Sequence, residues 1–95
     1  MQNKIYTINE KLWRWPGAGG WHFVTIDKRI YTEIRASFGK GMAPITVTLK
    51  GHTFDATLFP ETKTETYLLA IRKNIRRELD LFDGDSLSLT FSIKN

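Results

Sequence analysis

Hydrophobic and polar residues alternate with a period of two along most of the chain, and with a period near four in two shorter stretches. A period of two is typical of half-buried strands, whereas a period near 3.6 is typical of amphipathic helices. The alternating stretches predict strands at 4–15, 21–26, 44–49, 54–58, 66–70 and 87–93. The other two stretches predict short helices, and the chain is therefore expected to be mainly β with two short helices.

The first predicted helix is bounded by residues that favour helix ends. Asp27 is a suitable N-cap, because its carboxylate can accept a hydrogen bond from a free backbone N–H of the first turn. Ile30, Ile34 and Phe38 follow at four-residue spacing and are expected on the inward face. Gly39 stands where a capping glycine is common, so the helix is expected to end there.

The second predicted helix runs from Ile71 to about Leu79, with Ile71, Ile75 and Leu79 on its inward face. Between the third and fourth predicted strands, Lys-Gly-His at 50–52 predicts a tight reversal. These two strands are therefore expected to form an antiparallel hairpin.

Residues 24–34 resemble residues 69–79 when the two segments are aligned. Five positions carry identical or similar residues: Ile26 and Ile71, Lys28 and Lys73, Ile30 and Ile75, Glu33 and Glu78, Ile34 and Leu79. The match predicts an internal duplication with approximate units 12–50 and 54–93. Each unit is too small to bury its own apolar face, so the two are expected to share one core, as the chains of a homodimer do. A chain that completes its own strand pairing in this way is consistent with a monomer.

The segment 67–79, followed by Leu81 and Gly84-Asp85, resembles the strand–helix–strand pattern of the AbrB and MazE swapped-hairpin proteins. The whole chain is more similar to a bacterial family known as a domain of unknown function, DUF1905. Four short patterns carry this resemblance: Trp21-x-Phe23-Val24, Leu49-x-Gly51-x-x-Phe54, Leu58-x-Pro60, and Lys73-x-Ile75-Arg76 with Gly84-Asp85. The resemblance implies a double-split β-barrel capped by helices, in which one chain forms the barrel that two chains form in AbrB-like dimers. It implies no catalytic residues.

Composition limits the classes of protein that remain. The chain has 95 residues, 41% hydrophobic and 25% charged, which is ordinary for a single globular domain spanning 1–95. It has no cysteine, which excludes disulfides and cysteine-based metal sites. No apolar run approaches the roughly 20 residues that span a bilayer, so no membrane partner is expected. The N-terminal residues do not form a secretion signal, and a cytoplasmic location is expected.

The short motifs that indicate catalysis or a cofactor are missing from the sequence. The two histidines, His22 and His52, lack the paired spacing of a zinc site. The glycine-rich loop 17–20 lacks the Lys-Ser/Thr of a phosphate-binding loop, and Asp-Gly-Asp at 83–85 lacks the further ligands of a calcium loop. We therefore expect a non-enzymatic binding domain without catalytic residues, metal or cofactor.

A cluster of basic residues gives the first functional hypothesis. The net charge is +4, and basic side chains can neutralise phosphates and release their counterions. The hypothesis places nucleic acid on a basic helix face formed by Arg72, Lys73, Arg76 and Arg77, with Lys28 and Arg29 on the repeat-related helix. The alternative is a solvated helix face whose charge is partly balanced by neighbouring carboxylates.

Three tryptophans near the glycine-rich loop give the second hypothesis. If exposed, the rings of Trp13, Trp15 and Trp21 could stack on bases or line a pocket for a small molecule, and the hypothesis is a small-molecule or protein-binding barrel that uses this aromatic end. Tryptophans more often pack in the core, and we expect at least two of the three to do so. A contiguous positive surface would favour the nucleic-acid hypothesis, whereas a deep aromatic cleft would favour the ligand-binding one.

Overall fold

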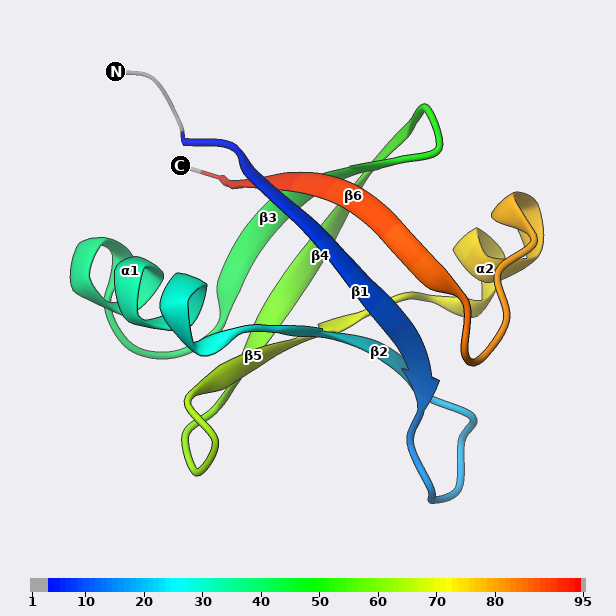
Figure 1. The fold of residues 1–95 in the computed structure, drawn as a ribbon, viewed down its shortest axis with the longest axis horizontal. Coiled ribbons are helices and arrows are strands. Elements are labelled where there is room, and N and C mark those ends of the chain that lie inside the picture. The colour runs from blue at the N-terminus through cyan, green and yellow to red at the C-terminus, as the bar shows by residue number, and fades with distance from the viewer. Residues whose placement is uncertain (1–3, 95) are drawn as a thin grey trace.

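A computed structural model describes residues 4–94 of the chain. This part forms six strands and two helices (Figure 1), in the order β1 (Tyr6–Arg14), β2 (His22–Ile26), α1 (Lys28–Phe38), β3 (Ala43–Leu49), β4 (His52–Glu61), β5 (Thr66–Ala70), α2 (Lys73–Leu79) and β6 (Ser86–Ile93). The prediction of a mainly-β chain with two short helices is confirmed.

The six strands close into one antiparallel barrel in the order β1-β2-β5-β4-β3-β6. Three of the pairings, β1–β2, β3–β4 and β4–β5, join neighbours along the chain, and the others join distant segments. The helices α1 and α2 connect β2 to β3 and β5 to β6, and they lie at opposite ends of the longest axis of the molecule (Figure 1). Closure leaves none of the described strands with a free edge.

The strand order is symmetric. Exchanging β1, β2 and β3 with β4, β5 and β6 leaves the order around the barrel unchanged. The β2–β5 pairing shows the same symmetry, because Val24 pairs with Leu69, the residue that the sequence match places over it. Two halves of like connectivity, β1-β2-α1-β3 and β4-β5-α2-β6, therefore build the barrel.

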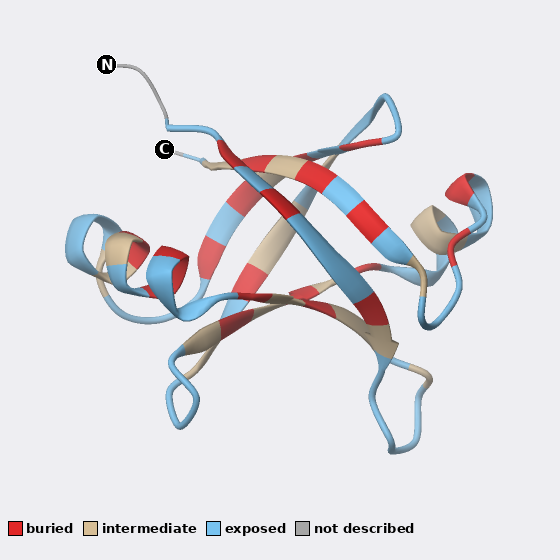
Figure 2. Ribbon diagram, viewed as in Figure 1, coloured by how far each residue is buried: buried red, intermediate tan, exposed pale blue. Residues whose placement is uncertain are grey.

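Alternation along each strand sends one set of side chains into the barrel. Figure 2 shows buried residues alternating with more exposed ones along β3 and β6. On β2 and β5 the paired residues Val24 and Leu69 are both fully buried. The first helix adds Ile30, Tyr31 and Ile34 to the same core, so strands and helix share a single hydrophobic cluster.

The predicted ends of α1 are confirmed. The Asp27 carboxylate accepts a hydrogen bond of 3.1 Å from the backbone N–H of Ile30, as expected for an N-cap. At the other end Gly39 has a φ of 108°, which favours glycine. The prediction that Phe38 faces inward is wrong: its side chain is 41% exposed, because it is the last residue of α1 and the chain turns away at Gly39.

The second helix is shorter than predicted. It begins at Lys73, because Ile71 continues the β2–β5 ladder by donating its backbone N–H to the carbonyl oxygen of His22 at 3.0 Å. Arg72 is the N-cap residue, with extended backbone and no capping hydrogen bond from its side chain. The helix ends after seven residues at Asp80, whose φ is 58°. No helix within residues 4–94 is long and apolar enough to cross a membrane.

The predicted β3–β4 hairpin is confirmed. Its two turn residues, Lys50 and Gly51, have φ values of 50° and 79°. Positive φ at both positions is the signature of a type I′ turn, whose twist matches that of the paired strands. The turn sets the register in which Leu49 pairs with His52.

Residues 68 and 69 provide a matched pair that tests the alternation. Leu69→Ala empties a fully buried site and should lower the free energy of unfolding by about 2–5 kcal/mol. Leu68→Ala removes the same atoms from a half-buried outer position and should lower it by about 1 kcal/mol. Urea denaturation of both variants measures the difference, and equal losses would contradict the assigned inward and outward faces.

Candidate functional site

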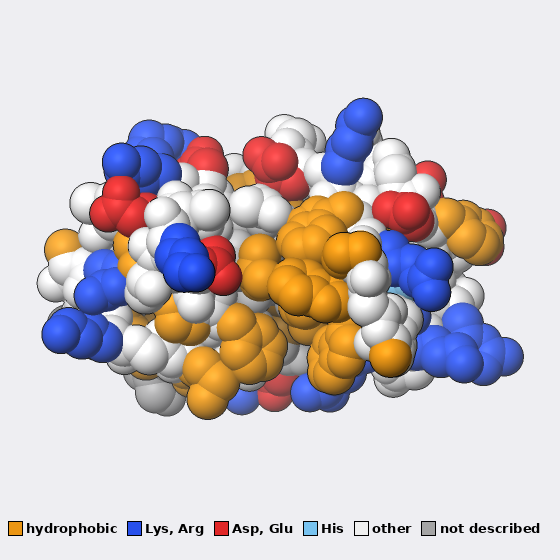
Figure 3. All heavy atoms as spheres, turned by 90° about the horizontal axis from the view of Figure 1, so that it is seen from below, with side chains coloured by type: hydrophobic (Ala, Val, Ile, Leu, Met, Phe, Trp, Pro, Cys, Tyr) orange, Lys and Arg blue, Asp and Glu red, His pale blue; other side chains and the backbone are white. Residues whose placement is uncertain are grey.

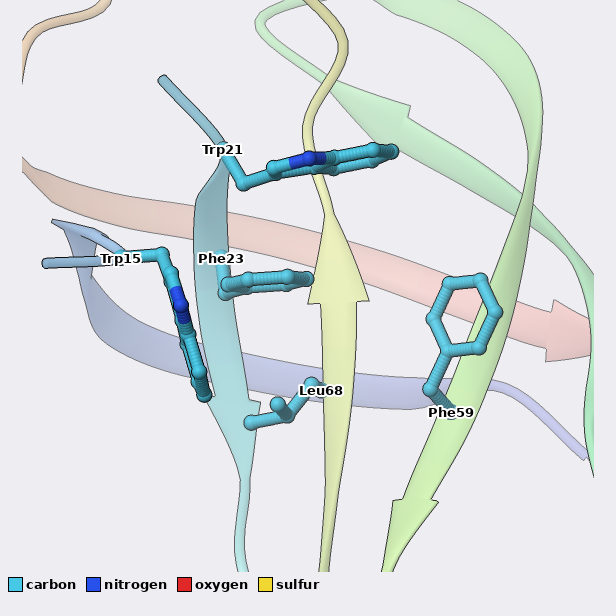
Figure 4. A pocket seen from close by; sticks show the side chains of 5 residues that line it. All are labelled: Trp15, Trp21, Phe23, Phe59 and Leu68. Atoms are coloured by element: carbon cyan, nitrogen blue, oxygen red, sulfur yellow. The ribbon is translucent and has the colours of Figure 1, made fainter. Parts of the chain in front are cut away.

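An open apolar hollow of about 290 Å³ lies on the outer surface of the barrel (Figure 4). We call it the aromatic face, and it is lined by Trp15, Trp21, Phe23, Phe59 and Leu68. It exists because consecutive apolar residues send one side chain inward and the next outward. Val24 is buried while Phe23 points out on β2, and the same holds for Leu69 and Leu68 on β5. Outward positions of a solvated sheet are usually polar, so apolar residues at these positions on three adjacent strands form an unusual surface.

The rings of the aromatic face are held close to one another. Trp21 and Phe23 are nearly parallel, with ring centroids 6.2 Å apart and planes at 8°. Trp15 meets the same Phe23 ring edge-on, at 6.0 Å and 78°, as Figure 4 shows. Both indoles remain open to solvent, since Trp15 is 45% and Trp21 56% exposed.

The glycine-rich loop between β1 and β2 lies against these indoles. A Cβ atom added at Gly17 would come within 3.0 Å of Cδ1 of Trp15, and one added at Gly19 within 3.1 Å of Cδ1 of Trp21. Side chains at these two positions would therefore require the rings to shift by a few tenths of an ångström. The loop therefore packs against both indole rings as well as joining the two strands.

Trp13 does not line the hollow. Its ring is half-buried and packs against those of Trp15 and Phe23, with centroid distances of 5.9 and 5.3 Å. Its Nε1 donates a hydrogen bond of 2.9 Å to Oγ1 of Thr25, which fixes the indole against β2. The expectation that at least two of the three tryptophans pack in the core is wrong. Trp13 and Trp15 at the end of β1, and Trp21 just before β2, all point to the outer side of the barrel.

A second surface, the basic hollow, lies at the α2 end of the barrel. This hollow of about 680 Å³ is lined by Arg14, His22, Lys73, Arg76 and Arg77, and also by Asp80, Leu81, Phe82 and Asp83. Four cationic side chains thus face two carboxylates, and the surplus is positive. Nη1 of Arg76 donates a hydrogen bond of 2.9 Å to the carbonyl oxygen of Ile71, which holds this guanidinium in place.

The basic residues of the two helices do not form one face. The helices lie at opposite ends of the molecule, so Lys28 and Arg29 are far from the basic hollow (Figure 1). Nζ of Lys28 pairs with Oε1 of Glu65 at 2.9 Å, and the hydrogen bond to this carboxylate raises the pKa of Lys28. Arg72 precedes α2 and lines a separate hollow that includes Asp55. The symmetric connectivity separates Lys28 and Arg29 from the α2 cluster, and the participation of these two residues in nucleic-acid binding stays a prediction.

The aromatic face and the basic hollow border each other at the β1–β2 hairpin. Arg14 stands between Trp13 and Trp15 in the chain and pairs with His22, the residue after Trp21. Alternation therefore turns Arg14 and His22 toward the basic hollow, and Trp15 and Trp21 toward the aromatic face. Figure 3 shows the large hydrophobic patch with Lys and Arg side chains beside it at the α2 end.

The histidines do not form a metal site. Nδ1 of His22 lies 2.7 Å from the carbonyl oxygen of Gly20, and Nδ1 of His52 lies 3.5 Å from Oε1 of Glu78 on the exposed surface. No local sequence pattern indicates the His52–Glu78 contact, because the β3–β4 hairpin and α2 are distant in the chain. Within residues 4–94 there is no group of three His, Asp or Glu side chains placed to hold a metal ion.

Fold and site together define a small closed β-barrel whose outer surface carries an aromatic face beside a basic hollow. The chain belongs to the family described as Domain of unknown function (DUF1905), whose model matches residues 10–91. No curated protein matches the chain. The resemblance to this family that the sequence motifs indicate is thereby confirmed.

The tryptophans should differ in their access to solutes. Trp15→Phe or Trp21→Phe removes an exposed indole and should lower the fraction of tryptophan emission that iodide quenches. Trp13→Phe removes the half-buried indole and should not lower that fraction. Iodide should also quench more strongly than caesium, because the neighbouring hollow is positive. Equal quenching of all three variants would contradict the described ring positions.

Proposed function

We propose that the protein is a non-enzymatic binding domain that binds nucleic acid through the basic hollow. The observation that supports this most directly is the presence of Arg14, Lys73, Arg76 and Arg77 around one hollow. Arginine side chains can bind phosphate oxygens with two parallel hydrogen bonds, and lysine adds a point charge.

The strength of the proposed binding follows from the charges at the site. Neutralising a phosphate releases condensed counterions, so affinity should fall steeply as the salt concentration rises. Asp80 and Asp83 oppose this attraction, and the net charge of the chain is only +4. We therefore expect dissociation constants of roughly micromolar order, typical of contacts to the phosphate backbone rather than to bases in a groove.

A second candidate function is the binding of a small molecule or a protein on the aromatic face. Its support is the apolar hollow of about 290 Å³, which is close to the lower end of the range for small-molecule sites, about 300–1,000 Å³. The hollow is open rather than a deep cleft, and it would leave much of a ligand exposed. A ligand screen by thermal shift, repeated with Trp15→Ala, tests this candidate, which requires that the shift depend on Trp15.

We also propose that the barrel arose by duplication and is the double-split, AbrB-like type. The symmetric strand order and the pairing of Val24 with Leu69 support this proposal. If the halves are equivalent, two copies of a chain spanning 52–94 should pair into a barrel with the circular dichroism of folded strands. A fragment that stays monomeric and unfolded at high concentration would argue against equivalence.

Removing charge from the basic hollow should weaken binding and its dependence on salt. Lys73→Ala combined with Arg77→Ala removes two exposed cations, and should lower the slope of log Kd against log salt by about 1.4–1.8. Fluorescence anisotropy of labelled oligonucleotides, duplex and single-stranded, across a salt series measures this. Arg29→Ala combined with Lys40→Ala is the matched control, because it makes the same change of charge at the α1 end. Equal effects of the two double variants would contradict a localised site.

A further inference from the structure

We propose that the aromatic face and the basic hollow bind one ligand together, a single-stranded nucleic acid. Unpaired bases would stack on the exposed rings while the phosphates of the same strand contact the cations of the hollow. This inference rests on the proposed function and names the form of nucleic acid that the site takes.

The first support is the exposure and arrangement of the indoles. Trp15 and Trp21 are the most exposed rings of the aromatic face, and Phe23 and the loop glycines hold them in place. A base can stack on any exposed aromatic ring, because every base has a π-face, and such stacking does not need a particular sequence. Rings that are already fixed lose little freedom when a base binds.

The second support is the position of positive charge along the border of the aromatic face. Arg14 and His22 connect the two surfaces at the β1–β2 hairpin. The phosphates next to a base stacked on Trp15 or Trp21 would therefore meet Arg14 and, beyond it, the other cations of the basic hollow.

The third support is the contrast between single and double strands. In a duplex the ring faces of the bases are covered by their neighbours, and proteins reach only the base edges. Duplex DNA would therefore contact the cations of the hollow and leave the aromatic face unused. An open, shallow surface of rings beside cations is the arrangement typical of proteins that bind single strands.

The experiment compares three probes of equal length: a thymidine octamer, an octamer of abasic sites, and a duplex of eight base pairs. The abasic strand keeps the phosphates and removes the rings. Fluorescence anisotropy at fixed low salt should show the thymidine octamer binding more tightly than the abasic strand. Trp15→Ala or Trp21→Ala should weaken binding of the thymidine octamer by roughly 5- to 150-fold, and leave the abasic strand almost unchanged.

Two further variants separate stacking from folding. Phe38→Ala removes an exposed aromatic ring at the α1 end and should leave every affinity unchanged. Gly17→Ala keeps both indoles but requires the ring of Trp15 to shift by a few tenths of an ångström, and should weaken binding of the thymidine octamer slightly and leave the abasic strand unchanged. Circular dichroism and thermal melting of each variant confirm that the barrel is intact.

The outcomes distinguish the inference from the proposed function. Equal affinity for all three probes, unchanged by the tryptophan variants but weakened by Lys73→Ala with Arg77→Ala, would overturn single-strand stacking and retain nucleic-acid binding. Binding of no probe at low salt would overturn both. Sedimentation that shows a dimer dissociated by Trp21→Ala would also overturn the inference, because a second copy of the chain would then cover the aromatic face.

Discussion

The antiparallel pairing of β2 with β5 is the interaction on which the rest of the structure depends. It joins the two halves of the chain and places Val24 against Leu69 in the core. The same pairing puts Phe23 and Leu68 on one outer surface, where they form the centre of the aromatic face. Its continuation from Ile71 to His22 sets where α2 begins, and so where the basic hollow lies. Core, aromatic face and basic hollow thus share one register.

A barrel of this size needs its inward residues for stability, but it does not need aromatic rings outside. Apolar side chains at outward positions leave apolar surface in water, which is unfavourable and favours association. The cations at the border counter self-association, since two copies that meet through this surface bring like charges together. Both features support the proposal of a flat, anionic partner.

Much of the fold could be predicted from the sequence, because strand alternation and helix caps are local signals. Asp27 and Gly39 placed the ends of α1 correctly. The start of α2 could not be placed, because the backbone of Ile71 is held by a strand that precedes it by almost fifty residues in the chain. The distance between the basic residues of α1 and those of α2 could not be predicted for the same reason: the separation of the helices is a property of the closed barrel.

The aromatic face could be predicted only in part. Trp15 and Trp21 were named from composition, but their exposure and the neighbouring residues Phe23, Leu68 and Phe59 depend on which strands pair. A signal was present in the sequence: Phe23-Val24, Leu58-Phe59 and Leu68-Leu69 are pairs of adjacent apolar residues within strands. Adjacent residues of a strand point to opposite faces, so each pair indicates a strand that is apolar on both sides. Three such pairs predict an apolar outer surface, although not its shape.

The contact between the glycine-rich loop and the indoles has a consequence for how the family can vary. Gly17 lies close to the ring of Trp15, and Gly19 lies close to the ring of Trp21. A Cβ atom at either position would be in tight contact with the ring. A larger residue at 17 or at 19 requires the facing indole to shift by a few tenths of an ångström, and at 19 the φ of 96° adds backbone strain. Substitutions at 17 and 15, and at 19 and 21, should therefore be coupled during evolution. Homologues that have lost both loop glycines should more often have smaller side chains at 15 and 21, and a reduced aromatic face on an unchanged barrel.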